Sequence, residues 1–135
     1  MVNPLDTSAW PIVHYVMPDR VPDAEAEFHV AAFEQLLRRG EAYVLIFSGA
    51  EMPKDSRHFM KLYSQWGKRS FAEQQRLCRG AVRVEPDPAK RNSLWRRAML
   101  YLMSSRAPYP YRIVASLPEA RDQAGKWLGG AGRHP

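Results

Sequence analysis

The chain has 135 residues, of which 45% are hydrophobic and 25% charged, with a formal net charge of +6 at pH 7. These values are typical of one soluble globular domain, long enough to bury a core without disulfide or metal support. The single cysteine, Cys78, excludes an internal disulfide and the usual zinc ligand sets. No apolar run approaches about 20 residues and no leader pattern precedes residue 10, so we expect a cytoplasmic protein without a membrane span.

The charge is distributed unevenly along the chain. Residues 1–53 carry three Lys and Arg against eight Asp and Glu, whereas residues 54–112 carry fourteen against four. A basic middle region attracts nucleic acid, anionic lipid or an acidic protein. Alternatively, these basic residues only form the solvated surface of Arg-rich helices and bind no partner.

The first half of the chain alternates strand and helix patterns. Residues 10–18 (WPIVHYVMP) have a β-branched and aromatic centre between two prolines and predict a strand. Residues 23–40 predict a helix, because apolar residues recur at three- and four-residue spacing and Gly40 follows as a terminator. Residues 42–47 (AYVLIF) are almost wholly apolar, which is typical of a central parallel strand covered on both faces.

The second half continues the alternation. A helix is predicted from about Asp55, and Ser70 with Glu73 has capping-box spacing, so residues 67–80 are either one continued helix or a second piece. Cys78 falls in this helical pattern. Further strands are predicted at 81–86 and 111–116, and further helices at 92–105 and after Ser116.

The order of elements predicts a single α/β domain over residues 10–128. We expect a four-stranded, mostly parallel sheet with helices on both faces, because βαβ crossovers are right-handed and bury both sides of such a sheet. Residues 1–9 are then an N-terminal extension, and residues 129–135 are predicted to be a disordered tail.

The segment around Ser56 lies where the second helix begins. Asp55 or Ser56 could cap the helix by accepting a hydrogen bond from an exposed N–H group. The same N–H groups, with Lys54 and Arg57 beside them, could instead bind an anion or a phosphate on Ser56. Asp55, Ser56 and His58 include the residue types of a catalytic triad, but neighbours on one helix do not converge as a triad does.

Three segments carry a resemblance to a known family: residues 44–56 (VLIFSGAEMPKDS), 78–86 (CRGAVRVEP) and 111–128 (YRIVASLPEARDQAGKWL). They resemble the STAS and SpoIIAA-like families, which include anti-sigma-factor antagonists and the cytosolic domains of sulfate transporters. With the first strand and helix, the resemblance covers most of residues 10–128. It implies an α/β fold and a non-catalytic regulator that binds a protein partner. In antagonist-type members the serine at this helix start is phosphorylated, which implies Ser56 as the phosphosite.

No familiar catalytic or metal-binding motif is present. The four histidines form no His-x-x-x-His pair, and the chain has no Gly-x-Ser-x-Gly elbow, P-loop or Gly-x-Gly-x-x-Gly. We therefore expect no catalytic residues, no metal and no cofactor.

Three functions follow, in order of preference. The first is a cytoplasmic regulator or adaptor that binds a protein partner and self-associates through faces of opposite charge, with Ser56 as a candidate switch and Lys54, Asp55, Arg57 and His58 beside it. The second is a nucleic-acid-binding module that uses the basic residues of 54–112, in particular Arg91, Arg96 and Arg97, with Tyr109 and Tyr111 as stacking platforms. The third is a carrier of a small molecule or lipid, because Trp- and Met-rich helices can line an apolar pocket.

Overall fold

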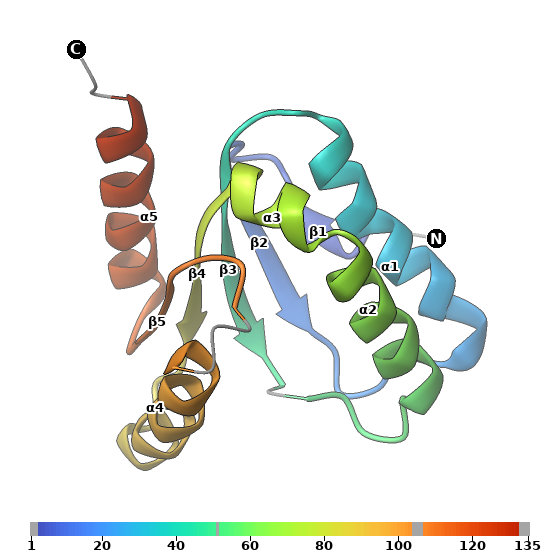
Figure 1. The fold of residues 1–135 in the computed structure, drawn as a ribbon. Coiled ribbons are helices and arrows are strands. Elements are labelled where there is room, and N and C mark those ends of the chain that lie inside the picture. Colours follow the sequence, from blue (N-terminus) through green and yellow to red (C-terminus); the bar gives the residue numbers. More distant parts are fainter. Residues whose placement is uncertain (1–2, 51, 104–106, 133–135) are drawn as a thin grey trace.

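A computed structural model describes residues 3–50, 52–103 and 107–132, with side chains except those of 97–103 and 130–132. Its sheet has the strand order β1-β2-β3-β4-β5 (Figure 1). The strands are β1 (Leu5–Asp6), β2 (Ile12–Met17), β3 (Tyr43–Gly49), β4 (Cys78–Val84) and β5 (Tyr111–Val114). β1 pairs antiparallel with β2, and all the other neighbours pair in parallel.

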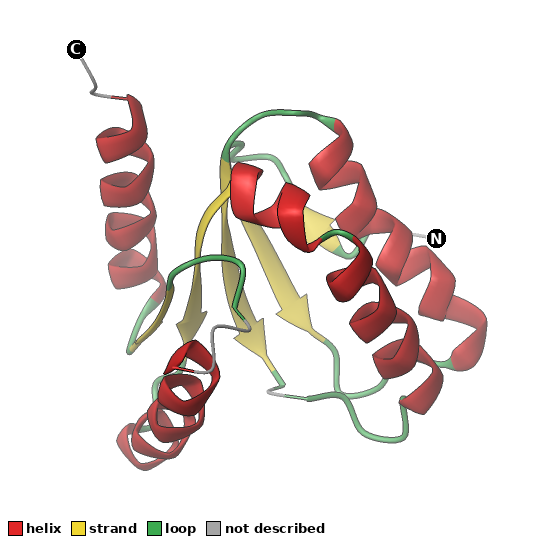
Figure 2. Cartoon of the chain, in the orientation of Figure 1, coloured by secondary structure: helices red, strands yellow, loops and turns green. Residues whose placement is uncertain are grey.

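Helices lie on both faces of this sheet (Figure 2). They are α1 (Asp23–Arg38), α2 (Arg57–Arg69), α3 (Phe71–Leu77), α4 (Pro88–Met103) and α5 (Leu117–Gly132). α1, α2 and α3 cover one face, and α5 covers the other face over β3 and β4. α4 lies against β5, close to the carboxyl end of β4 (Figure 1).

The predicted α/β class, the mostly parallel sheet and the placement of helices on both faces are confirmed. The predicted number of strands is wrong, because the sheet has five. The additional strand is β1, which lies inside the predicted N-terminal extension. It has only two residues, too few to show an alternating pattern, yet Leu5 is buried and pairs with Tyr15 of β2.

The structure decides one open boundary and differs from two predicted ones. The helical segment after Asp55 breaks at Ser70 into α2 and α3, which decides the question left open for residues 67–80. Cys78 begins β4 instead of continuing a helix, because the backbone is already extended at this residue, with φ −81° and ψ 116°. α5 continues to Gly132 and so runs into the segment expected to be disordered.

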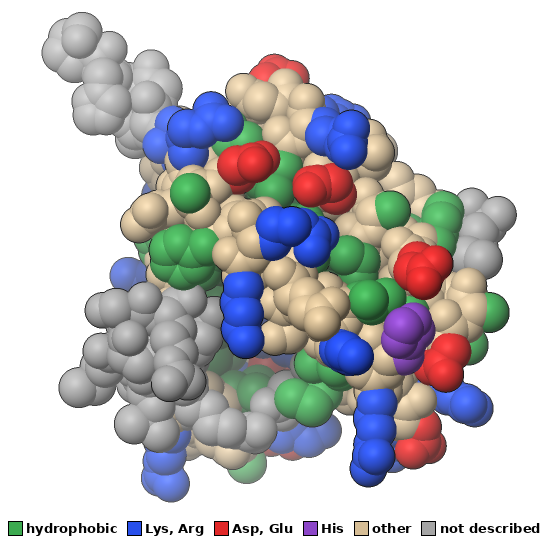
Figure 3. Space-filling model, turned by 45° about the vertical axis from the view of Figure 1, so that its right-hand side comes forward, with side chains coloured by type: hydrophobic (Ala, Val, Ile, Leu, Met, Phe, Trp, Pro, Cys, Tyr) green, Lys and Arg blue, Asp and Glu red, His purple; other side chains and the backbone are tan. Residues whose placement is uncertain are grey.

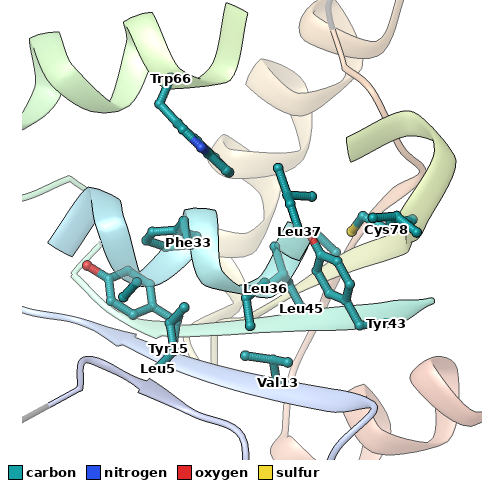
Figure 4. Close-up of a cluster of buried hydrophobic side chains, with 13 residues drawn as sticks. Leu5, Val13, Tyr15, Phe33, Leu36, Leu37, Tyr43, Leu45, Trp66 and Cys78 are labelled. Atoms are coloured by element: carbon teal, nitrogen blue, oxygen red, sulfur yellow. The ribbon is translucent and has the colours of Figure 1, made fainter. Parts of the chain in front are cut away.

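The main core lies between the sheet and the layer of α1, α2 and α3 (Figure 4). Alternation along the strands places Val13, Tyr15 and Leu45 on this side. A smaller core under α5 contains Ile46, Val82 and Ala120. β3 therefore buries both of its faces, as its apolar sequence predicts.

Across the described ranges, no helix has the length and apolarity needed to cross a membrane.

Candidate functional site

A cavity of about 730 Å³ opens between α2, α3 and the segment that leads into β5. Four aromatic side chains line it: Tyr63 and Trp66 from α2, Phe71 from α3, and Tyr109 from the segment before β5. We call it the aromatic cavity. Its size lies within the range of clefts that bind small molecules, about 300–1,000 Å³.

The wall formed by α2 consists of aromatic rings that stack in series. Phe59, Tyr63 and Trp66 follow one another at three- and four-residue spacing, which places them on one face of the helix. The ring centroids of Phe59 and Tyr63 are 5.7 Å apart, and those of Tyr63 and Trp66 are 5.8 Å apart, with nearly parallel planes. Phe33 of α1 packs against Trp66 with ring centroids 5.7 Å apart, so the indole ring is held between α1 and Tyr63 (Figure 4).

A buried chain of hydrogen bonds fixes the polar side of the cavity. Ser70, at the break between α2 and α3, donates to the carbonyl oxygen of Trp66 at 2.6 Å. Gln74 of α3 lines the cavity and donates from Nε2 to Ser70 Oγ at 2.9 Å. Both polar side chains are almost fully buried. The indole N–H of Trp66 is also buried, without a hydrogen-bond acceptor among the described residues.

The cavity has a positive rim. Lys68 is the one charged side chain among its described lining residues, and it is exposed. An open cavity with aromatic walls and a single cation attracts a flat apolar group that carries a negative charge.

Ser56 lies directly before α2 but does not cap it, since no side-chain capping bond forms. Its hydroxyl accepts a hydrogen bond from the backbone N–H of Val21 at 2.8 Å and donates to the carbonyl oxygen of Lys54 at 2.7 Å. Only 3% of the residue is exposed. Ser56 therefore ties the loop after β2 to the loop after β3.

The other residues predicted around Ser56 are nearer the surface. Lys54, Asp55 and Arg57 are exposed, and Asp55 has a left-handed backbone with φ 47°. His58 is half-buried, with Nε2 4.0 Å from the carboxylate of Glu27 on α1. The structure thus brings these residues together around the start of α2, but the Ser56 hydroxyl itself is enclosed.

The basic residues predicted for nucleic-acid binding differ in their exposure to solvent. Arg91 is half-buried, and its guanidinium donates to the carbonyl oxygens of Glu85 and Pro86 at 2.9 and 2.8 Å. Arg96 is exposed, and the side chain of Arg97 lies outside the described residues. On the face shown in Figure 3, Lys and Arg side chains are separated by acidic and apolar ones and form no continuous basic patch.

The two tyrosines predicted as stacking platforms lie elsewhere. Tyr109 and Tyr111 pack against the core on the side of α1, α2 and α3. Tyr111 begins β5, whereas Arg91 binds the backbone just beyond the carboxyl end of the neighbouring parallel strand, β4. The tyrosines and Arg91 are therefore at opposite ends of β5.

The sequence did not predict two sets of polar contacts, because each set joins segments that are distant in the chain. His14 Nε2 and Ser48 Oγ form a 2.8 Å hydrogen bond between β2 and β3, and only the strand register brings them together. Arg83 of β4 is 6% exposed and donates to the carbonyl oxygens of Gly49 and Ala50, beside a smaller cavity of about 230 Å³. In the part of the chain that the structure describes, no three His, Cys, Asp or Glu side chains gather as metal ligands.

No known protein family, curated protein or solved structure matched the chain.

Proposed function

We propose that this chain is a binding domain for a small organic ligand with a flat apolar body and an acidic group. The observation that carries the proposal is the aromatic cavity, whose stacked Tyr63 and Trp66 offer a preformed wall. Aromatic walls bind flat apolar groups, and a preformed site loses little conformational entropy on binding. Lys68 at the rim provides the cation that would face the acid.

This proposal corresponds to the carrier interpretation of the sequence and has more support than the other two. A regulator switched at Ser56 needs a hydroxyl that a kinase can reach, and the Ser56 hydroxyl is enclosed by two hydrogen bonds. The nucleic-acid interpretation needs basic and aromatic side chains on one surface, and Tyr109 faces the aromatic cavity instead.

An NMR titration of ¹⁵N-labelled protein with 2-naphthoate tests the proposal. This probe has two fused rings and one carboxylate, which match the aromatic wall and Lys68. We expect saturable shifts of the amide signals of Gly67 and Phe71 and of the indole signal of Trp66. The indole signal of Trp127, which packs on the opposite face of the sheet, serves as an internal control. Shifts that centre on Trp127, or no shifts at millimolar probe, would contradict the proposal.

A further inference from the structure

On the polar wall of the aromatic cavity, the hydroxyl proton of Ser70 determines which groups donate and which accept hydrogen bonds. A serine hydroxyl has a single proton. The carbonyl oxygen of Trp66 can only accept, so the 2.6 Å contact with it uses the proton of Ser70. Ser70 Oγ is then left as an acceptor.

The amide of Gln74 must adapt to this acceptor. Its contact with Ser70 Oγ, at 2.9 Å, requires an N–H donor, because an amide oxygen at that place would set two acceptors against each other. The orientation of the amide is therefore fixed, with Nε2 toward Ser70 and Oε1 on the other side. Among the residues whose side chains the structure describes, none donates a hydrogen bond to Oε1.

Gln74 lines the cavity although only 6% of the residue is exposed. Oε1 is not among the fully buried side-chain atoms that lack a partner, so it is open to the cavity, and a donor on a bound ligand can replace the water there. We infer that Gln74 Oε1 is the specificity determinant of the aromatic cavity and selects ligands that carry a hydroxyl or N–H donor besides their flat apolar body and acid. This inference rests on the proposed function and specifies its ligand class.

Three probes that share one ring system and one carboxylate test the inference: 2-naphthoate, 6-hydroxy-2-naphthoate and 6-methoxy-2-naphthoate. The hydroxyl compound adds a donor, and the methoxy compound adds an oxygen without a donor. We expect the hydroxyl compound to bind about three- to tenfold more tightly than either of the others, because this is the gain in affinity that one additional hydrogen bond typically provides. The dissociation constants come from the same NMR titration.

Two variants locate the effect. Gln74→Met keeps the length of the side chain and removes Oε1, so the hydroxyl probe should lose its advantage: the ratio of its dissociation constant to that of 2-naphthoate should rise to about one. Ser70→Ala keeps Gln74 but releases its amide, so the preference should decrease. If Gln74→Met does not fold, Ser70→Ala still tests whether the preference for the hydroxyl probe depends on the orientation of the Gln74 amide.

The outcomes separate the two proposals. If all three probes bind wild type equally, or if Gln74→Met keeps the preference, the inference about Gln74 is wrong and the cavity remains a binding site. If no probe binds wild type, the proposed function fails, and the inference fails with it.

Discussion

The indole ring of Trp127 lies directly on Gly80, so that a β-carbon on this glycine would be 2.4 Å from Cε3 and Cζ3 of the ring. Trp127 belongs to α5 and Gly80 to β4. The missing side chain therefore lets α5 approach the sheet closely and cover the face opposite to the aromatic cavity. This contact joins the last helix to the centre of the fold.

Gly80→Ala should destabilise the protein. The added methyl group overlaps a large ring that packs against the smaller core under α5, and overpacking of this kind typically costs about 1–3 kcal/mol of unfolding free energy. Urea unfolding measures the change. Gly125→Ala, on the same helix as Trp127, is the control, because a β-carbon there meets nothing within 4 Å. This control should gain up to about 1 kcal/mol from helix propensity. Equal stability of Gly80→Ala and wild type would contradict the close packing.

Ser56→Ala should destabilise the protein by about 1–3 kcal/mol, since the buried N–H of Val21 loses its acceptor. Ser56→Asp should cost more, because it places a carboxylate at a residue that is 3% exposed. Ser64→Asp, at an exposed position of α2, is the control and should change the unfolding free energy by no more than about 0.5 kcal/mol. A fully stable Ser56→Asp that changes binding to a partner protein would instead support the regulatory interpretation.

Alkaline pH should destabilise the protein before it ionises the buried groups. Burial raises the pKa of the Cys78 thiol and that of the Tyr15 hydroxyl to about 12. The unfolded chain has ordinary pKa values of about 8.5 and 10 for these groups, so it releases protons first and is favoured as pH rises from about 9 toward 12. Urea unfolding between pH 7 and pH 11 should show decreasing stability.

Cys78→Ala separates the contribution of the thiol. The decrease in stability between pH 8 and pH 10 should be smaller in this variant than in wild type, whereas the part due to Tyr15 remains. In native wild type, the thiol should also resist a thiol reagent at pH 8 and react only after unfolding, because the residue is 3% exposed. Rapid labelling of the folded protein would contradict this account of Cys78.

Lys68→Met should weaken binding of 2-naphthoate by up to about fivefold, the effect of removing one exposed charge pair. It should leave binding of the uncharged analogue 2-naphthamide unchanged. Lys61→Met, at another exposed position of α2, is the control and should bind both probes as wild type does. Equal loss of both probes would show that Lys68 acts through packing and not through charge.

The elements that the sequence predicted well carry strong local signals. β3 is almost wholly apolar and is covered on both faces, and the stripe that includes Phe33 marks the inner side of α1. The sequence could not reveal β1, whose two residues are held by pairing with β2. Nor could it place Cys78 in a strand, because the pairing of Cys78 with Tyr43 of β3 joins distant positions of the chain.

The candidate site depends on the same kind of non-local contact. The three- and four-residue spacing of Phe59, Tyr63 and Trp66 in α2 indicates that Trp66 faces the interior, where it is buried. This spacing gave no sign that Tyr109, which follows more than 40 residues later, would complete a cavity beside it. Ser56 shows the reverse. Its position before a helix predicted a cap or an accessible site, whereas the hydroxyl binds Val21, a residue of another loop.

The most direct test of ligand binding in the aromatic cavity is calorimetric titration of 2-naphthoate into wild type, Gly67→Leu and Gly125→Leu. Gly67 lines the cavity and a β-carbon there meets nothing within 4 Å, so leucine extends into open space without disturbing the core. Gly125 has the same open surroundings on α5, on the opposite face of the sheet.

We predict that wild type and Gly125→Leu bind the probe alike, and that Gly67→Leu folds at least as stably as wild type but binds at least about tenfold more weakly. Binding by Gly67→Leu equal to that of wild type would contradict a ligand site in this cavity.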